Sequence, residues 1–434
     1  MSNIITKFAT LVTAHDSRSI PGACAWSAGE PVILKDTTTS SNGEEFYFVS
    51  GATSNRVYIV KSSDHWQTYS YVESGSAIAF SSPYVVQDST GKCHFFDATN
   101  GYYQRISLVH TAGAITGFAV DGSALTLPIS NLYGNDQTAD AVSIITSSGV
   151  EYIVLVATFR PNVGNTFVSS VTVFPIGITS AASFTSLSGT ANSATILADT
   201  NSFNSHSERM RVEQHPISKD LFFVIGAHVA ESQSSLSAIS YYRFTTSGST
   251  TWSISGSLVS LTMTNGSQGP FVFGICRTAN YVWLGYTDPT NGIRFGRFLS
   301  DGTWTASTVA SPDTRDGLYI TGAFRVASDE SRIYLACSTG QYGGAPANPP
   351  WGTASNVLAY YDGSAWNYYA DNAGITDNWG CAGCSNIGSG VSAIISNATQ
   401  DGIYITSIFD NTSNINNSPI ITPFSSNIAF DFGF

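Results

Sequence analysis

One stretch of the chain, residues 271–305, reads FVFGICRTANYVWLGYTDPTNGIRFGRFLSDGTWT. It contains three runs rich in Val, Ile, Phe, Tyr and Trp, separated by polar groups such as Asp-Pro-Thr-Asn-Gly and Ser-Asp-Gly. Short apolar runs with turn-forming breaks are typical of antiparallel strands, and a weaker strand follows the Asp-Gly turn. The stretch therefore predicts one unit of four antiparallel strands.

The same succession of apolar runs and polar turns recurs on both sides of this stretch, for example in residues 83–107 and 323–368. Four-stranded units repeated around an axis form a β-propeller, in which circular closure protects most strand edges. We therefore predict an all-β fold, a seven-bladed β-propeller of four-stranded antiparallel blades that occupies residues 1–434 as one domain. The expected blades are 21–75, 76–135, 136–200, 201–262, 263–315, 316–375 and 376–434.

The C-terminal sequence SNIAFDFGF, residues 426–434, alternates apolar and polar side chains as a half-buried strand does. We expect it to complete the terminal blade by pairing with a strand from the N-terminal segment.

Charge and composition exclude several classes of partner. Hydrophobic residues make up 42% of the 434 residues and charged residues only 11%, with a net charge of −12. An acidic chain without a basic cluster is not expected to bind nucleic acid or an anionic membrane surface. No apolar segment approaches the roughly 20 residues that a spanning helix needs, and the N-terminus shows no signal peptide. We expect an extracellular or virion-surface location without a recognisable signal.

The segment Ser62-Ser-Asp-His-Trp-Gln-Thr-Tyr69 resembles the Asp-box, or BNR repeat, Ser-x-Asp-x-Gly-x-Thr-aromatic, with Trp66 where glycine is usual. Remnants of the same pattern occur at Ser300–Trp304 and Asp362–Trp366. The resemblance covers a small part of the chain and implies a propeller, because in that superfamily the Asp-box is a structural hairpin away from the active site. The sialidases that carry this repeat have an N-terminal Arg-Ile-Pro segment, which this chain does not match.

The general composition, low in charge and rich in Ser, Thr, Gly and Asn, is similar to that of phage virion proteins (tail fibres, receptor-binding and decoration proteins) and of leaderless propeller lectins. We expect a surface-recognition protein that binds a glycan, a cell-surface polysaccharide or a partner protein, including other virion proteins. Aromatic side chains in Gly- and Pro-rich loops are suited to stack on sugar rings. The candidates are Tyr342, Trp351 and Trp379, although packing of the loops explains them equally well.

The alternative function is a polysaccharide lyase or glycosidase acting on a uronate-containing polysaccharide. Such a lyase needs a base beside the uronate carboxylate and a cation to neutralise the developing charge. The densest group of suitable residues is His206, Arg209, Arg211 and Glu213. In a strand, Arg209, Arg211 and Glu213 share one face. The competing interpretation is an Arg–Glu network that fills a polar central channel.

Metal and cofactor sites are not expected. Cys381 and Cys384 form a CxxC pair, but a zinc site needs further ligands, and the nearest histidine is His228. Whether the two cysteines form a disulfide stays open. His94 lies in an apolar run and is expected to be a buried residue with its polar atoms satisfied.

Overall fold

The structure is a computed structural model of the whole chain. Strands and turns are described for the ranges that follow: 18–19, 34–50, 57–63, 70–73, 83–97, 101–127, 138–145, 149–159, 168–180, 185–186, 209–226, 239–246, 252–254, 259–261, 273–288, 292–306, 322–326, 330–331, 333–340, 354–361, 363–364, 366–370, 392–393, 402–409 and 420–429. Every regular element within these ranges is a strand, as predicted for an all-β fold. No described helix is long and apolar enough to cross a membrane.

The strands form seven separate antiparallel sheets in the described part of the chain, numbered here in chain order. Sheet 1 holds β2 (Leu34–Lys35), β3 (Glu45–Ser50), β4 (Val57–Ser62) and β5 (Ser70–Glu73). Sheet 2 holds β6 (Pro83–Gln87), β7 (Cys93–Asp97), β8 (Tyr102–Thr111), β9 (Ala114–Val120) and β10 (Leu125–Thr126). Sheet 3 holds β11 (Thr138–Ile145), β12 (Glu151–Phe159), β13 (Val168–Pro175) and β14 (Thr185–Ser186).

The second half of the chain continues the pattern. Sheet 4 holds β15 (Arg209–Gln214), β16 (Leu221–Gly226), β17 (Ile239–Thr246), β18 (Trp252–Ile254) and β19 (Val259–Leu261). Sheet 5 holds β20 (Phe273–Arg277), β21 (Val282–Asp288), β22 (Gly292–Phe298) and β23 (Trp304–Ala306). Sheet 6 holds β24 (Gly322–Val326), β25 (Ile333–Gly340), β26 (Ala354–Tyr361) and β27 (Trp366–Ala370).

Sheet 7 joins the two ends of the chain. It holds β28 (Ser392–Ala393), β29 (Gly402–Phe409), β30 (Ile420–Ala429) and the N-terminal strand β1 (Arg18–Ser19). Arg18 pairs with Ile421 and Ser19 with Ile420. An N-terminal strand therefore pairs with the last strand of the chain, as expected, but it does so through Ile420 and Ile421, upstream of the segment 426–434 that was predicted to pair.

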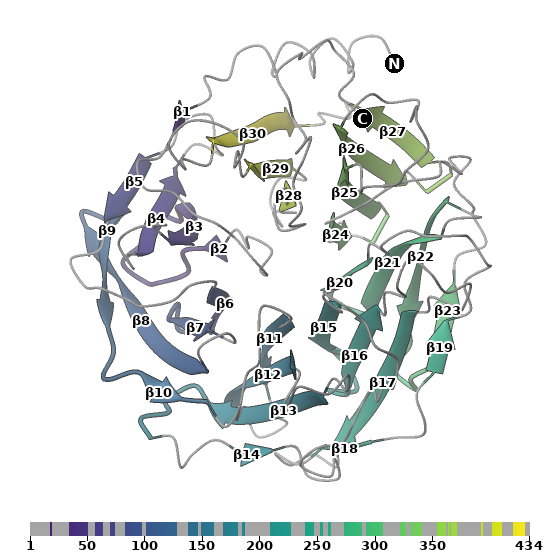
Figure 1. Cartoon of the computed structure of the whole chain (residues 1–434), viewed down its shortest axis with the longest axis horizontal. Helices are drawn as coiled ribbons and strands as arrows, with labels where there is room; N and C mark the ends of the chain where they lie inside the picture. The colour runs from purple at the N-terminus through teal and green to yellow at the C-terminus, as the bar shows by residue number, and fades with distance from the viewer. Residues whose placement is uncertain are drawn as a thin grey trace.

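The sheets are arranged around a common centre, each with its first strand innermost (Figure 1). The inner strands β6, β11, β15, β20, β24 and β28 contact one another in succession. Between neighbouring sheets the strands bury apolar side chains. Phe46 and Phe48 of sheet 1 pack with Cys93 and Phe95 of sheet 2, and equivalent cores join sheets 2 and 3 and sheets 4 and 5. Neighbouring sheets are thus held together mainly by burial of apolar area, the dominant favourable term in folding.

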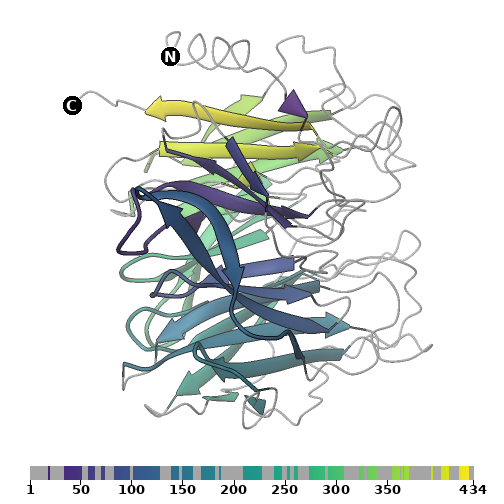
Figure 2. The same cartoon turned by 90° about the vertical axis from the view of Figure 1, so that its left-hand side faces the viewer.

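The two ends of the ring differ. In sheets 1 to 6 the connections from the first strand to the second and from the third to the fourth lie at one end, which we call the turn end; it includes turns 36–44, 88–92, 215–220 and 299–303. These short turns gather along one side of Figure 2. The second-to-third and sheet-to-sheet connections join strand ends at the opposite end, the loop end. Among connections between described strands, the longest, 187–208 and 371–391, both belong to the loop end.

Candidate functional site

The structure describes only some of the residues that were predicted to bind a ligand or to take part in catalysis. The aromatic candidates Tyr342, Trp351 and Trp379 and the candidate base His206 lie outside the described residues, as do Cys381 and Cys384. The backbone of Arg209 begins β15, and the side chains of Arg211 and Glu213 are described further along this strand. The structure therefore places part of the charged group and none of the aromatic one.

The charged strand β15 is the innermost strand of sheet 4 (Figure 1). Val212 is buried, whereas Arg211 and Glu213 on the other face are half-buried, as the alternation predicted. Glu213 Oε1 lies 3.6 Å from Arg277 Nε at the end of β20 in sheet 5. Four residues of strand separate Arg209 from Glu213, about 13 Å at the usual rise. The ion pair links Glu213 to the neighbouring inner strand, and the predicted role of Glu213 beside His206 stays a prediction, because His206 lies outside the described residues.

A recurrent cation lies on the third strand of four sheets. Each of these residues pairs across the ladder with an aromatic ring on the second strand. The four pairs are Lys61 with Phe46, Arg105 with His94, Arg243 with Phe222, and Arg297 with Trp283. Because the faces that carry them pack on the following sheet, a charge at this position must be neutralised within the interface or lose hydration without compensation.

The neutralising groups differ between sheets. In sheets 1 and 4 a carboxylate two residues before the paired ring takes this role. Lys61 Nζ lies 2.9 Å from Glu44 Oε1, and Arg243 Nη2 lies 2.7 Å from Asp220 Oδ2. In sheet 5 the same position is Tyr281, and the guanidinium of Arg297 lies 4.3 Å from the centre of its ring. A cation–π contact thus replaces the ion pair.

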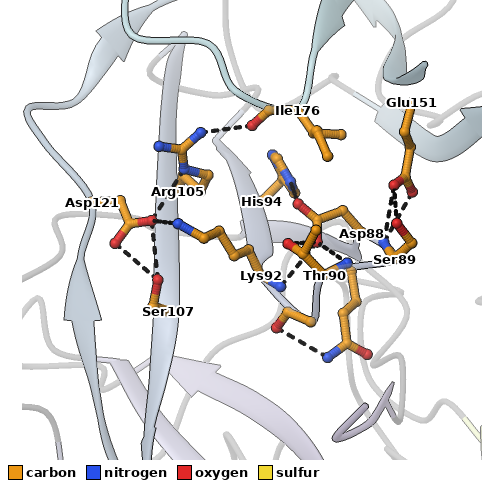
Figure 3. Close-up of polar contacts among 12 residues, drawn as sticks. Asp88, Ser89, Thr90, Lys92, His94, Arg105, Ser107, Asp121, Glu151 and Ile176 are labelled. Carbon is orange, nitrogen blue, oxygen red and sulfur yellow. Dashed lines mark hydrogen bonds and ion pairs between the residues drawn. The ribbon is translucent and has the colours of Figure 1, made fainter. Parts of the chain in front are cut away.

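Sheet 2 shows the most elaborate version (Figure 3). Two residues before the paired ring, where sheets 1 and 4 have a carboxylate, sheet 2 has Lys92. Lys92 and Arg105 both contact the carboxylate of Asp121. Lys92 Nζ lies 2.7 Å and Arg105 Nε 3.2 Å from Asp121 Oδ2. Burial raises the pKa of Asp121, but hydrogen bonds from Lys92 and Ser107 outweigh it and hold the pKa below its usual value. Asp121 therefore stays ionised between two cations.

The arginines of sheets 2 and 4 also reach the next sheet. Arg105 Nη1 donates to the carbonyl of Ile176, which follows the third strand of sheet 3, at 2.6 Å. Arg243 Nη1 donates to the carbonyl of Asp301, which follows the third strand of sheet 5. The two contacts are equivalent in position: each arginine is anchored by a carboxylate of its own sheet and donates to a turn of the following one. Charged donors make stronger hydrogen bonds than neutral ones.

A buried relay lies beside this cluster in sheet 2. His94 Nε2 lies 3.0 Å from Asp88 Oδ2, and His94 Nδ1 lies 2.9 Å from the hydroxyl of Tyr103. All three residues are buried. Burial lowers the pKa of His94, although Asp88 acts in the opposite direction, and burial raises the pKa of Tyr103. The expectation that His94 is a satisfied buried residue is confirmed, and no atom of the relay is open to a substrate.

The Asp88 carboxylate also organises the β6–β7 turn. Its Oδ1 accepts from the backbone nitrogens of Thr90 at 2.8 Å and Lys92 at 3.0 Å. The next residue, Ser89, donates from both its backbone nitrogen and its hydroxyl to Glu151 of sheet 3. Burial raises the pKa of Asp88, yet the hydrogen bonds from His94 and Thr90 prevail and lower it. The turn is thus fixed from within and tied to the next sheet.

A second Asp–His pair joins sheets 1 and 2 at the turn end. Asp36 Oδ1 accepts from the backbone nitrogen of Thr38 at 3.1 Å, and Asp36 Oδ2 lies 2.5 Å from His110 Nε2. His110 Nδ1 lies 3.4 Å from the hydroxyl of Ser40, which is exposed. This relay has the same order as the buried one, aspartate, histidine and hydroxyl, but its hydroxyl faces solvent.

The sequence did not single out Asp36, Asp88 or His110. The available signal was the tripeptide Asp-x-Thr at 36–38, 88–90 and 301–303, where the aspartate side chain accepts from the threonine backbone nitrogen. The same tripeptide also occurs at 97–99, 136–138, 288–290 and 410–412. Such turns are common local motifs, so the tripeptide alone predicts a turn and not its histidine partner. Within the described ranges no group of three or more His, Cys, Asp or Glu residues is placed to hold a metal ion.

No protein-family model matches this chain, and no curated protein matches it in sequence. Several solved structures resemble it in outline. An AofleA mutant from Arthrobotrys oligospora has 7% identity and a TM-score of 0.40, covering 83% of this chain and 90% of that one. The fungal lectin of Aleuria aurantia, described as a six-bladed β-propeller, has 9% and 0.39, covering 82% and 96%. An α-L-arabinanase from Penicillium chrysogenum has 11% and 0.39, covering 74% and 94%. Similarity at this level assigns no function.

Proposed function

We propose that this chain is a seven-bladed β-propeller that recognises glycans through its loop end. The blade count is supported by the seven sheets in the described residues and by their arrangement around one centre (Figure 1). It is supported further by the position of sheets 1 to 6, each within one of the repeat ranges 21–75 to 316–375. Pairing of β1 with β30 supports closure of the ring between the last unit and the first.

One topological observation carries the choice of surface. The connections that contain Tyr342, Trp351 and Trp379 all join strand ends at the loop end. Gly340, which ends β25, pairs with Ala354, which begins β26, and the segment between them contains Tyr342 and Trp351. The connection from β27 to β28 contains Trp379. An exposed ring is described at the same end, because Tyr102 begins β8 with 43% of its surface exposed.

The turn end supports this choice by contrast. Several of its described carboxylates and cations are engaged with one another, as in the pairs Lys61–Glu44, Lys92–Asp121 and Arg243–Asp220. Groups that already satisfy one another are poor ligand contacts. The net charge of −12 further favours neutral glycans over polyanionic ones, because a polyanion is repelled by the field of an acidic protein.

The experiment is a glycan array followed by affinity measurement on the best ligand. Trp351→Ala and Trp379→Ala should each weaken binding at least tenfold, about 1.4 kcal/mol. The matched control is Ile217→Ala, which removes an exposed apolar side chain at the turn end. Equal binding by all three variants, or no glycan bound, would refute the proposal. Release of unsaturated product from a uronate polysaccharide, lost in His206→Ala, would establish the lyase instead.

The site of action is proposed as extracellular or on a virion surface, where a glycan receptor is met. The support is compositional: only 11% of the residues are charged, and polarity comes from neutral side chains. Mass spectrometry of purified virus particles, or of culture supernatant against washed cells, tests this location. Recovery of the chain from the cytosolic fraction alone would contradict it.

A further inference from the structure

We propose that Ser40 is a nucleophile, activated by His110 and Asp36, that accepts activated acyl or phosphonyl groups. The proposal comes from comparing the buried relay within sheet 2 with the relay that joins sheets 1 and 2. In both, an aspartate that caps its own turn binds histidine Nε2, and histidine Nδ1 contacts a hydroxyl. In the relay of sheet 2 the hydroxyl belongs to buried Tyr103, whereas in the relay of sheets 1 and 2 it belongs to exposed Ser40.

In the neutral form of His110, the hydrogen-bond partners fix which ring nitrogen carries the proton. An ionised carboxylate only accepts hydrogen bonds, so Nε2 carries the proton toward Asp36 and Nδ1 keeps its lone pair. That lone pair is directed at the Ser40 hydroxyl at 3.4 Å, slightly beyond the usual range but within what unliganded sites show. Burial raises the pKa of Asp36, but hydrogen bonds from His110, Ser41 and Thr38 prevail and lower it. The histidine is therefore oriented as a general base.

The reaction follows from this geometry. Ser40 Oγ forms a bond to the carbonyl carbon of an activated ester while its proton passes to His110 Nδ1. The carbon–oxygen bond to the alcohol then breaks, and the departing oxygen takes the proton from His110, leaving an acylated serine. With a fluorophosphonate the phosphorus–fluorine bond breaks and fluoride leaves. Water then releases the acyl group by the reverse proton path.

The surroundings of Ser40 limit the rate. The backbone nitrogens of Ser41 and Asn42 already donate to the carbonyls of Thr38 and Gly113, and that of Gly43 donates to Ser41 Oγ. The N–H groups that follow the nucleophile are thus unavailable to a developing oxyanion, and loss of one such donor costs about 10²–10³ in rate. We therefore expect covalent labelling by activated reagents and slow turnover.

The experiment is labelling of the full chain with a fluorophosphonate, followed by intact mass and peptide mapping. A single adduct on Ser40 is expected, absent in Ser40→Ala and retained in Thr39→Ala, which removes the exposed hydroxyl of the preceding residue. Ala in place of His110 should lower the labelling rate at least tenfold, within the usual contribution of a general base, and added imidazole should restore part of it. Labelling spread over several exposed hydroxyls, or an unchanged rate in His110→Ala, would overturn the proposal.

Asp36 acts through His110, and its variant tests the positioning role. In Asp36→Asn the amide oxygen still caps Thr38, but the NH₂ group faces Nε2 and forces the proton onto Nδ1. The labelling rate should fall at least tenfold at a temperature where both proteins are fully folded, whereas a purely structural role would lower the thermal midpoint and leave the labelling rate of the folded protein unchanged. Equal labelling by wild type and Asp36→Asn at equal thermal midpoints would also overturn the proposal. Because Ser40 lies at the turn end, labelling and glycan binding can be lost independently.

Discussion

The contact between Arg243 and Asp220 gives the sharpest test of how the sheets are joined. Arg243 makes two short contacts to Asp220 Oδ2, at 2.9 Å from Nε and 2.7 Å from Nη2, and also donates to the Asp301 carbonyl of the next sheet. The Asp220 side chain is 6% exposed, and that of Arg243 is 24% exposed. Substitution of Arg243 by Met keeps much of the aliphatic length but removes both interactions.

The magnitude follows from what the substitution leaves behind. Removing one partner of a buried ion pair costs about 3–5 kcal/mol, since the remaining charge is buried without compensation. Arg243 is partly exposed, so water can reach the vacated space and the cost falls to the lower end of that range. The lost hydrogen bond to Asp301 adds about 1 kcal/mol. We expect Arg243→Met to lower the free energy of unfolding by about 3–4 kcal/mol.

A double-mutant cycle with Asp220→Asn isolates the pairwise part. The asparagine amide is neutral, so Asp220→Asn alone should lower the free energy of unfolding by about 1–2 kcal/mol. Arg243→Met should then lower it less in the Asp220→Asn background than in the wild type. The expected coupling is about 1–2 kcal/mol, in the range found for contacting residues. Urea denaturation followed by tryptophan fluorescence and by far-UV circular dichroism measures these values, with coincident transitions as the check that one cooperative unit is observed.

Sheet 5 supplies the matched control. Arg297 occupies the equivalent position but rests on the rings of Tyr281 and Trp283, 4.3 Å and 5.5 Å from their centres. Among the described residues no carboxylate is paired with Arg297, so Arg297→Met should cost only about 1 kcal/mol. A loss in Arg243→Met no larger than in Arg297→Met, or additivity of the cycle within about 0.5 kcal/mol, would falsify the view that Asp220 requires its arginine.

Three further outcomes are expected. Burial lowers the pKa of both His94 and His215 in the folded chain. Below the ordinary histidine pKa of about 6.5, the unfolded chain therefore binds more protons than the folded chain. The thermal midpoint should therefore fall between pH 7 and pH 5, less steeply in His215→Asn, and a flat profile contradicts this. Below about pH 4, protonation of Asp36, Asp88 and Asp121, whose pKa values are lowered, should remove further stability. Gly302→Ala should lower the thermal midpoint more than Gly122→Ala. Both glycines have positive φ, 86° and 80°, but a Cβ at Gly302 would meet the Arg243 guanidinium, whereas a Cβ at Gly122 would face open space. Glu151→Gln should cost about 1–2 kcal/mol, because a neutral amide accepts more weakly from Ser89; no loss in urea denaturation would show that this contact does not join sheets 2 and 3.

The sequence by itself determined the strands of this protein and the order in which they pair. Strand propensity and turn residues act over a few neighbouring positions, so β6, β7 and β8 and the strands of sheet 5 follow from local sequence. The burial of His94 and the shared face of Arg211 and Glu213 follow equally, because side chains alternate along a strand. The need to protect a strand edge favoured a pairing between the two terminal segments, but alternation pointed to residues 426–434, whereas the pairing uses Ile420 and Ile421.

Only the tertiary structure decided which residues meet between sheets. Asp36 and His110 are 74 positions apart and Arg243 and Asp301 are 58 apart, and nothing in the local pattern links them. Their contacts depend on how two twisted sheets pack against each other, which fixes the partner of a charge at the interface. For the same reason Glu213, singled out from sequence for chemistry beside His206, lies in an ion pair with Arg277 of the neighbouring inner strand.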